Sequence, residues 1–390
     1  MRHLGLVALA AGVVLSSAAP VVAQTRVVRV SSKILGEERV VHVSLPPNYA
    51  LAKQRYQVIY LLDGHVRQFF DLTVAAAEYD LTGDGHEYAT PPQIVIGVDQ
   101  RDRGADLGRN QELFTRFLVE ELVPYVDREY RTTPYRTLIG HSLGGRFALM
   151  TFCRAPGVFP AVIAISAAGG DSTAADGVTR CLTEAFASGS GALRQLVFSA
   201  GEREARTLAG VQRLGDLLRA RAPANWRWTV LGGPGLGHTA TPLATIPPGI
   251  RFVHDASVWE LPATTVDSIT RGALDPDAGI AAFYARLSSR LGSPVSTSRR
   301  WLLAAAHAYL AQADPALAES AVRRVISAYP EDLEAYGMLS ALALRRGDAS
   351  AARRALDDAM HMLDRLEFFD VYDRERKRQV IRDALGSIPR

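Results

Sequence analysis

Residues 136–150, RTLIGHSLGGRFALM, contain the pattern on which the predicted fold depends most. An apolar run leads into a glycine-rich corner that carries Ser142, and a helix-forming run follows it. The pentapeptide GHSLG has the pattern G-x-S-x-G, in which a serine stands on a sharp strand-to-helix turn. Side chains beside such a corner would collide, so we expect Gly140 and Gly144 to be required there. The pattern predicts that Ser142 is a nucleophile, and the alternative is an inert serine in a glycine-rich turn.

The sequence around this stretch predicts an α/β fold. Two β-branched runs at 26–35 and 39–49 flank a short turn and predict a hairpin. Helical spacing appears between the later apolar runs, for example over 110–130. Apolar runs without alternation are typical of parallel strands covered on both faces; they occupy 56–64, 92–100, 136–140, 161–166, 194–201 and 226–233. The alternation predicts a layered, mostly parallel sheet with an antiparallel start.

Bulk composition excludes some functions. The chain has 390 residues and a formal net charge of only +3, without a long Lys/Arg block, so a nucleic-acid partner is not expected. Cys153 and Cys181 lack metal-ligand spacing, so no metal is expected. An exported protein could join these two cysteines in a disulfide, and two unpaired core thiols are the alternative.

The N-terminus has the layout of a secretory signal peptide. A short positive start precedes an apolar core over 4–18, and small residues follow up to a cleavage position after Ala23. The core is short for a spanning helix, which needs about 20 residues. We therefore expect residues 1–23 to be removed and the protein to be periplasmic or secreted, with no membrane span after cleavage.

The composition also predicts the domains. Residues 24–255 form the α/β domain, 256–273 read as a linker, and 274–390 lack strand signals and read as all helix. The pattern of this part repeats with a period of 34 residues, so that Leu302 aligns with Tyr336 and Ala306 with Ser340. This period is similar to tetratricopeptide repeats, which bind proteins or associate with one another. A plain helical bundle is the alternative.

The candidate base follows from the order of the chain. A G-x-S-x-G hydrolase places its acid and then its histidine after the serine. Of the histidines after Ser142, His307 and His361 lie in the helical part, and His254 lies near a helix. His238 lies in a loop directly after the last apolar run, so it is the predicted base. His141 adjoins the serine, but we expect its direction to be wrong for pairing, which leaves it a structural role.

The candidate acid is one of two glutamates. Glu202 and Glu204 directly follow the run 194–201, whereas the other carboxylates between Ser142 and His238 do not. Such an acid would orient the imidazole and stabilise its charged form. Spacing alone does not separate the two.

An oxyanion hole needs two backbone N–H groups. One is the amide of Leu143, directly after the serine. The other is expected after the third strand, where Gly64 permits a tight turn and the amide of His65 is the best candidate.

Several segments together resemble a known family: YLLDG, IGVDQRDRGADL, FLVEELVPYVDREYRTTPYRTLIGHSLGGRFAL, SAGEREA and GHTATP. They are similar to the esterase family of α/β-hydrolases that includes esterase D type enzymes, siderophore (enterobactin-type) esterases and mycolyltransferases, in a branch with C-terminal tetratricopeptide-like repeats. The resemblance implies an α/β-hydrolase sandwich followed by an all-α repeat domain. It also implies that the acid is Glu204, through the pattern G-x-x-E, and it supports His65 in the oxyanion hole. The segment DRGADLGRN departs from the family segment richer in Thr and Pro that lines the cleft mouth.

The resemblance and the residues predict a serine esterase that needs no cofactor and acts on a small-molecule ester. Acyl transfer is a variant of this chemistry. The alternative is an interaction protein whose helical part binds a partner or a second copy and whose α/β domain is a scaffold. Four aromatic side chains could line an acyl pocket but are more often core residues: Phe69, Phe70, Trp226 and Trp228.

Overall fold

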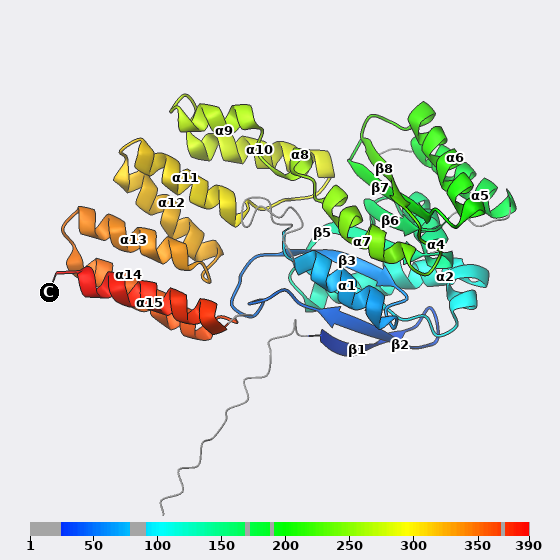
Figure 1. Cartoon of the computed structure of the whole chain (residues 1–390), viewed down its shortest axis with the longest axis horizontal. Coiled ribbons are helices and arrows are strands. Elements are labelled where there is room, and N and C mark those ends of the chain that lie inside the picture. The colour runs from blue at the N-terminus through cyan, green and yellow to red at the C-terminus, as the bar shows by residue number, and fades with distance from the viewer. Residues whose placement is uncertain (1–24, 79–90, 168–171, 188–190, 368–370, 390) are drawn as a thin grey trace, which may run out of the picture.

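The computed structural model describes residues 25–78, 91–167, 172–187, 191–367 and 371–389 (Figure 1). Eight strands form one sheet in the order β1-β2-β4-β3-β5-β6-β7-β8. β1 pairs antiparallel with β2 and β2 antiparallel with β4, whereas every further neighbouring pair is parallel. The predicted mostly parallel sheet with an antiparallel start is therefore confirmed. The strands are β1 Thr25–Ser32, β2 Glu37–Ser44, β3 Tyr56–Leu62, β4 Gln93–Val98, β5 Thr132–His141, β6 Ala161–Ile165, β7 Arg194–Gly201 and β8 Trp226–Gly233.

Helices cover both faces of this sheet. α1 and α7 pack against each other on one face, where α1 contacts β4 and α7 contacts β6, β7 and β8. On the other face α4 contacts β5 and β6, and α6 contacts β7 and β8. The helical elements are α1 Arg67–Glu78, η1 Ala105–Arg109, α2 Gln111–Arg116, η2 Phe117–Leu122, α3 Val123–Glu129, α4 Leu143–Arg154, α5 Ser172–Ala187, α6 Ala205–Arg221 and α7 Thr241–Val253. We call residues 25–255 the sheet domain.

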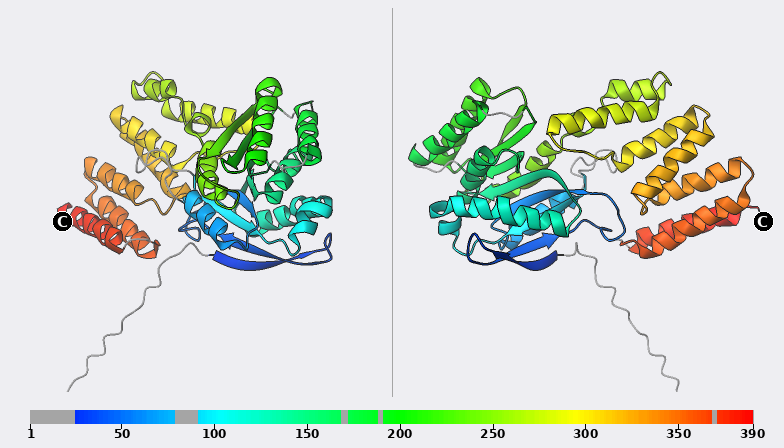
Figure 2. Two further views of the ribbon diagram at one scale, coloured as in Figure 1. Left: turned by 45° about the vertical axis from the view of Figure 1, so that its right-hand side comes forward. Right: turned by 180° about the vertical axis from the view of Figure 1, so that it is seen from behind.

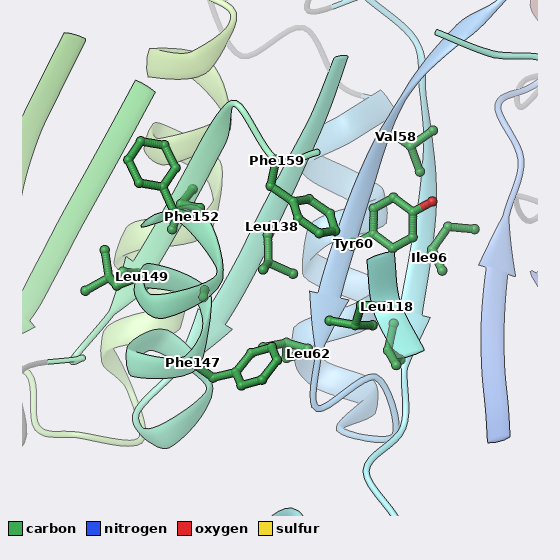
Figure 3. Packing of buried hydrophobic residues seen from close by; sticks show 14 of the residues in the cluster. Val58, Tyr60, Leu62, Ile96, Leu118, Leu138, Phe147, Leu149, Phe152 and Phe159 are labelled. Carbon is green, nitrogen blue, oxygen red and sulfur yellow. The ribbon is translucent and has the colours of Figure 1, made fainter. Parts of the chain in front are cut away.

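The central strands are buried on both faces, as their unbroken apolar runs predict. Along β3 the side chains of Tyr60 and Leu62 join the cluster that includes Phe147 and Phe159, with the Tyr60 and Phe159 rings edge to face at 5.4 Å (Figure 3). Ile59 and the other β3 side chains that point to the opposite face of the sheet join a second cluster, which lies beneath α7. This packing on both faces fixes the carboxyl ends of the parallel strands relative to one another.

The rest of the chain is helical and forms an arc beside the sheet domain (Figures 1 and 2). We call residues 256–389 the helical region. The stretch read as a linker, 256–273, holds α8 and α9, and its Trp259 is buried. The helices are α8 Ala256–Trp259, α9 Ala263–Thr270, α10 Pro276–Leu291, α11 Arg299–Ala311, α12 Pro315–Ala328, α13 Leu333–Arg345, α14 Ala349–Arg365 and α15 Val371–Ser387. Among the described helices, none is long and apolar enough to cross a membrane.

Two helix pairs in this region repeat. The pair α11 and α12 begins at Arg299 and Pro315, and the pair α13 and α14 begins 34 residues later at Leu333 and Ala349. The second helix of each pair is capped by an aspartate, Asp314 or Asp348, whose carboxylate accepts a backbone N–H three residues later. The sequence period thus corresponds to a structural one.

The helical region docks at the amino ends of the parallel strands. The amide of Leu193, just before β7, donates to the carbonyl of Arg290 at 2.6 Å. The ring of Trp259 packs edge to face on Tyr135, early in β5, at 5.2 Å. The amide of Glu367 donates to Asn48 Oδ1 at 2.7 Å, in the loop before β3. These contacts all lie away from the carboxyl ends of the strands, where the predicted site residues are.

Candidate active site

Ser142 stands on a strained corner between β5 and α4. Its φ of 59° and ψ of −119° are unfavourable for a residue with a side chain. The corner is held by its backbone: the Ser142 amide donates to the carbonyl of Ile165 at 2.8 Å, and its carbonyl accepts from the amide of Arg146 at 3.0 Å. Such strain is common at functional sites, because the surrounding structure must enforce it.

The glycines around the corner have unequal importance. A side chain on Gly140 would collide with the backbone carbonyl of Gly144. A Cβ on Gly145 would lie 2.9 Å from the carbonyl oxygen of Ile165, which is too close. A Cβ on Gly144 would lie 3.4 Å from Asp63 Oδ2, close to an ordinary contact. The steric requirement that the sequence suggested for Gly140 and Gly144 therefore applies most strongly to Gly140 and Gly145.

His238 reaches Ser142 from the loop after β8. Its Nε2 lies 2.8 Å from Ser142 Oγ, and its Nδ1 lies 2.5 Å from Glu204 Oε2. A carboxylate can only accept from Nδ1, so the neutral ring has Nε2 unprotonated and ready to accept from the serine hydroxyl. The structure thus brings together the three residues that the sequence selected, in the order acid, base and hydroxyl.

Glu204 is fixed through its other oxygen. Oε1 accepts from Ser166 Oγ at 2.7 Å, from the Gly201 amide at 2.9 Å and from Thr241 Oγ1 at 2.9 Å. Burial raises the pKa of Glu204, but the hydrogen bonds from His238, Ser166, Gly201 and Thr241 outweigh it and lower that pKa to about 2. The carboxylate is therefore charged wherever the imidazole can act as a base.

Glu202 has a different partner. Its Oε2 accepts from the amide of Gly235 at 2.7 Å, so it holds the turn that precedes the histidine loop. The geometry therefore separates the two glutamates that spacing left open, and it pairs Glu204 with His238. Asp171 lies outside the described residues.

The two predicted oxyanion amides have no competing backbone partner in the described part of the chain. Leu143 is the first residue of α4, where an N–H has no intrahelical acceptor. On the other side, the Gly64 amide donates to Val98 O at 3.0 Å and the Val66 amide to Asp63 O at 2.8 Å, which leaves the His65 amide between them. A side chain on Gly64 would collide with the backbone of Gly97. Their role as an oxyanion hole stays a prediction.

His141 anchors the base instead of pairing with the serine. Its Nε2 lies 2.9 Å from the backbone oxygen of His238, and the two rings are 4.6 Å apart. Burial and the neighbouring His238 lower the pKa of His141, which favours the neutral ring. Phe69 also packs edge to face on His141, with the ring centroids 5.6 Å apart.

The remaining aromatic candidates lie elsewhere. Phe70 and Trp226 are buried, and Trp226 packs on Phe152 and Phe186 at the amino end of β8. Of the four aromatic residues, Phe69 contacts a residue of the site. Cys153 and Cys181 are both free thiols in the structure.

Sequence reasoning missed the side chains that support the site. Thr241 is only three residues beyond His238, so the loop sequence contained a signal for it. Ser166 ends the run 161–166, and its hydroxyl reaches Glu204 only because β6 lies beside β7. Without the strand order, the sequence has no signal for that contact.

Comparison with known proteins assigns the family. The model of the family described as "Putative esterase" matches residues 32–230, slightly more than half of the chain. The chain belongs to this esterase family.

Two curated proteins of Bacillus subtilis (strain 168) are similar to part of the chain. The uncharacterized protein YjcH is 35% identical over 141 residues, covering 34% of this chain and 57% of its own. The ferri-bacillibactin esterase BesA is 29% identical over 155 residues, covering 33% of this chain and 53% of its own. The chain thus spans a little over half the length of these relatives.

Solved structures share the fold. An IroE-like serine hydrolase from Shewanella oneidensis matches with a TM-score of 0.61 at 19% identity, over 77% of this chain and 98% of that one. An uncharacterised protein from Capnocytophaga ochracea matches with a TM-score of 0.58 at 15% identity, over 93% of this chain and all of that one. The second match extends into the helical region, so the combination of both parts recurs in another protein. The predicted α/β-hydrolase fold followed by an all-helical region is confirmed.

Proposed function

We propose that the protein is a serine esterase that hydrolyses carboxylic esters through an acyl-enzyme, with Ser142 as nucleophile, His238 as base and Glu204 as acid. The observation that carries this proposal is the chain of contacts from Glu204 Oε2 through His238 to Ser142 Oγ, at 2.5 and 2.8 Å. Membership of the esterase family supports the same reaction class.

In the first half of the reaction Ser142 Oγ attacks the ester carbonyl while His238 Nε2 takes its proton. The carbonyl oxygen becomes an oxyanion, which the amides of Leu143 and His65 stabilise. The intermediate then collapses, His238 returns the proton to the leaving oxygen, and the alcohol departs. Glu204 stays ionised throughout and stabilises the imidazolium.

In the second half water takes the place of the alcohol. His238 accepts a proton from the water, whose oxygen attacks the acyl carbon, and the same amides stabilise the second oxyanion. Collapse releases the carboxylic acid, and the proton returns to Ser142 Oγ. An alcohol acceptor in place of water would make the reaction an acyl transfer. None of these steps calls for a metal or an organic cofactor.

The substrate that we propose is an ester met outside the cytoplasm, with a siderophore ester as the leading member of that class. The relative BesA, whose name is ferri-bacillibactin esterase, supports a siderophore ester. The signal-like residues 1–23 support export to the periplasm or the exterior.

The nucleophile is tested with a fluorophosphonate probe and a p-nitrophenyl ester. We expect the wild type to be labelled and to hydrolyse the ester, and Ser142→Ala to do neither while it keeps its circular dichroism spectrum. A folded wild type that neither reacts with the probe nor hydrolyses any ester would overturn the proposal.

The substrate is tested with a panel of p-nitrophenyl esters of rising chain length beside a ferric catecholate trilactone. The siderophore proposal predicts that the trilactone has the highest kcat/KM. Preference for a simple acyl ester would contradict it without affecting the reaction class, and a transesterified product in added alcohol would indicate acyl transfer.

A second function is favoured by the two helix pairs that repeat after 34 residues. We propose that the helical region is a tetratricopeptide-like surface for self-association. Sedimentation of the whole chain is expected to show a dimer at micromolar concentration, for wild type and Ser142→Ala alike. A monomer at all concentrations would contradict this second function.

A further inference from the structure

We propose that Arg103 is a positioning residue that sets the spacing between the two oxyanion amides and neutralises a buried carboxylate beside them. This inference rests on the proposed esterase function and extends it to a residue outside the Ser142, His238 and Glu204 set.

Arg103 joins the two corners of the backbone that carry the amides. Its Nε donates to Asp63 Oδ1 at 2.6 Å, and its Nη2 donates to Asp63 Oδ2 at 3.0 Å and to the carbonyl oxygen of His141 at 2.8 Å. A planar guanidinium holds such a set of acceptors in one fixed geometry, which a lysine cannot do.

The two acceptors stand in equivalent places. Asp63 follows β3 and precedes the His65 amide by two residues, and His141 ends β5 and precedes the Leu143 amide by two residues. β3 and β5 are neighbours in the sheet. Because one guanidinium spans both strand ends, it fixes the distance between the segments from which the two N–H groups project.

Strain makes this fixation necessary. Asp63 has a φ of 58° and Ser142 a φ of 59°, so both corners adopt the left-handed region that side chains disfavour. The side chain of Gln100, two residues after β4, supports Asp63 on one side: the Asp63 amide donates to Gln100 Oε1 at 2.8 Å. The bonds from Arg103 support Asp63 on the side that faces the corner between β5 and α4.

Charge gives Arg103 its second role. The Asp63 side chain is only 5% exposed, and its Oδ2 lies 3.4 Å from the place that a Cβ on Gly144 would take, in the first turn of α4. An unpaired carboxylate there would oppose the negative charge that develops on the substrate oxygen, since few water molecules would screen it. The pair with Arg103 cancels that charge.

The segment that carries Arg103 is held by a buried ion pair between Arg39 and Asp106. Asp106, three residues after Arg103, accepts from Arg39 Nη1 at 2.6 Å and, through its other oxygen, from Nη2 at 2.8 Å. The same carboxylate accepts from the amide of Arg101 at 3.1 Å. The segment that carries Arg103 is therefore fixed to β2, and the guanidinium does not have to be ordered when substrate binds.

The test compares three variants with wild type on the preferred p-nitrophenyl ester: Arg103→Lys, Arg103→Met and the double variant Arg103→Met with Asp63→Asn. The matched control is Arg101→Met, whose side chain pairs at the surface with Glu37 and is 75% exposed. Misplacement of catalytic groups by about 1 Å costs roughly 100-fold in rate. We expect Arg103→Met to lose about this much in kcat with KM within twofold of wild type, and Arg101→Met to lose nothing.

The other variants separate the two roles. Arg103→Lys retains the charge without the fork, so it is expected to lose less than Arg103→Met. The double variant also removes the carboxylate that Arg103→Met leaves unpaired, so its kcat is expected to be about tenfold higher than that of Arg103→Met. Affinity for an alkylboronic acid, whose tetrahedral adduct places an oxygen where the oxyanion forms, is expected to fall in parallel with kcat/KM. A residue that only stabilised the fold would lower the thermal midpoint without this parallel.

Unchanged kcat in Arg103→Met, a loss confined to KM, or boronate affinity that stays constant while kcat falls would overturn the proposal. If Arg103→Met does not fold, Arg103→Lys decides in the same way, with wild-type kcat as the contradicting result. A wild type without any hydrolysis would overturn the esterase function itself, whereas an active wild type with an unaffected Arg103→Met would overturn only the role of Arg103.

Discussion

At the scale of single residues, the site consists of three groups in series and the contacts that orient them. Ser142 was predictable because its motif is local, and His238 because the chain order of this fold leaves few histidines. Glu204 and Glu202 follow the same strand, and their spacing cannot show which carboxylate the turn at 201–204 directs toward the base; only the family pattern G-x-x-E implied Glu204. The backbone decides it, since Glu202 bonds the Gly235 amide and Glu204 meets His238.

Exchange of either glutamate tests this distinction. Glu204→Gln removes the charge that stabilises the imidazolium, and loss of the corresponding acid costs about 10⁴-fold in kcat in a serine protease. Glu202→Gln, the matched control, is expected to keep kcat within a few-fold. The measurement is steady-state hydrolysis of a p-nitrophenyl ester, and equal losses in the two variants would contradict the assignment of Glu204.

The low pKa of Glu204 predicts a stability that depends on pH. The pKa is near 2 in the folded protein and about 4.3 in an unfolded chain. The charged form thus favours the fold above the unfolded value, and this contribution is lost as the pH falls from about 4.3 toward 2. Urea unfolding of wild type and Glu204→Gln between pH 6 and pH 3 measures it: the stability difference between the two should shrink in acid. A difference that stays constant over this range would contradict the low pKa.

At the scale of elements, the corner between β5 and α4 depends on how closely the helix approaches β6. Three strand ends carry a non-glycine residue with positive φ, namely Asp63, Ser142 and Ser166. They adjoin one another through β3, β5 and β6, so the strain is concentrated where the proposed chemistry takes place. The sequence predicted the strands and the helix, but not the Ser166 contact, because that contact depends on the order of strands in space.

Gly145→Ala tests the close approach of α4. Its new Cβ would lie 2.9 Å from Ala167 Cβ and from Ile165 O, so the helix must shift, which costs about 1–3 kcal/mol for overpacking. The shift would move the Leu143 amide, and kcat should fall at least tenfold. Gly157→Ala is the control, because nothing lies within 4 Å of its Cβ. Thermal unfolding and ester hydrolysis measure both, and full activity of Gly145→Ala would contradict the argument.

At the scale of the whole molecule, the helical region and the predicted site lie at opposite ends of the parallel strands. The helical region contacts the amino ends of the parallel strands, at Leu193, Tyr135 and the loop before β3, whereas Ser142 follows the carboxyl end of β5. The sequence predicted a helical region but not its docking, which depends on side chains such as Trp259 in the stretch read as a linker. Over its described residues, the helical region therefore packs on the sheet domain without lining the candidate site.

Trp259→Ala tests this separation. The indole is 7% exposed, packs on Tyr135 and donates to the carbonyl of Val253 at 2.8 Å. Removal of a buried tryptophan costs about 3–5 kcal/mol. We expect this loss in urea unfolding with kcat and KM unchanged below the transition, and a smaller loss for the partly exposed Trp228→Ala. A large fall in kcat of folded Trp259→Ala would show that the helical region does act on the site.

We propose above that Ser142 is a nucleophile activated by His238 and Glu204. The most direct measurement is mass-spectrometric mapping of the fluorophosphonate adduct after tryptic digestion. Cleavage after Arg136 and Arg146 releases residues 137–146, the peptide TLIGHSLGGR, in which Ser142 is the only serine. The adduct is predicted on this peptide in wild type, at a rate that falls steeply in Glu204→Gln and His238→Ala. An adduct on another serine, or equal labelling rates in all three proteins, would contradict it.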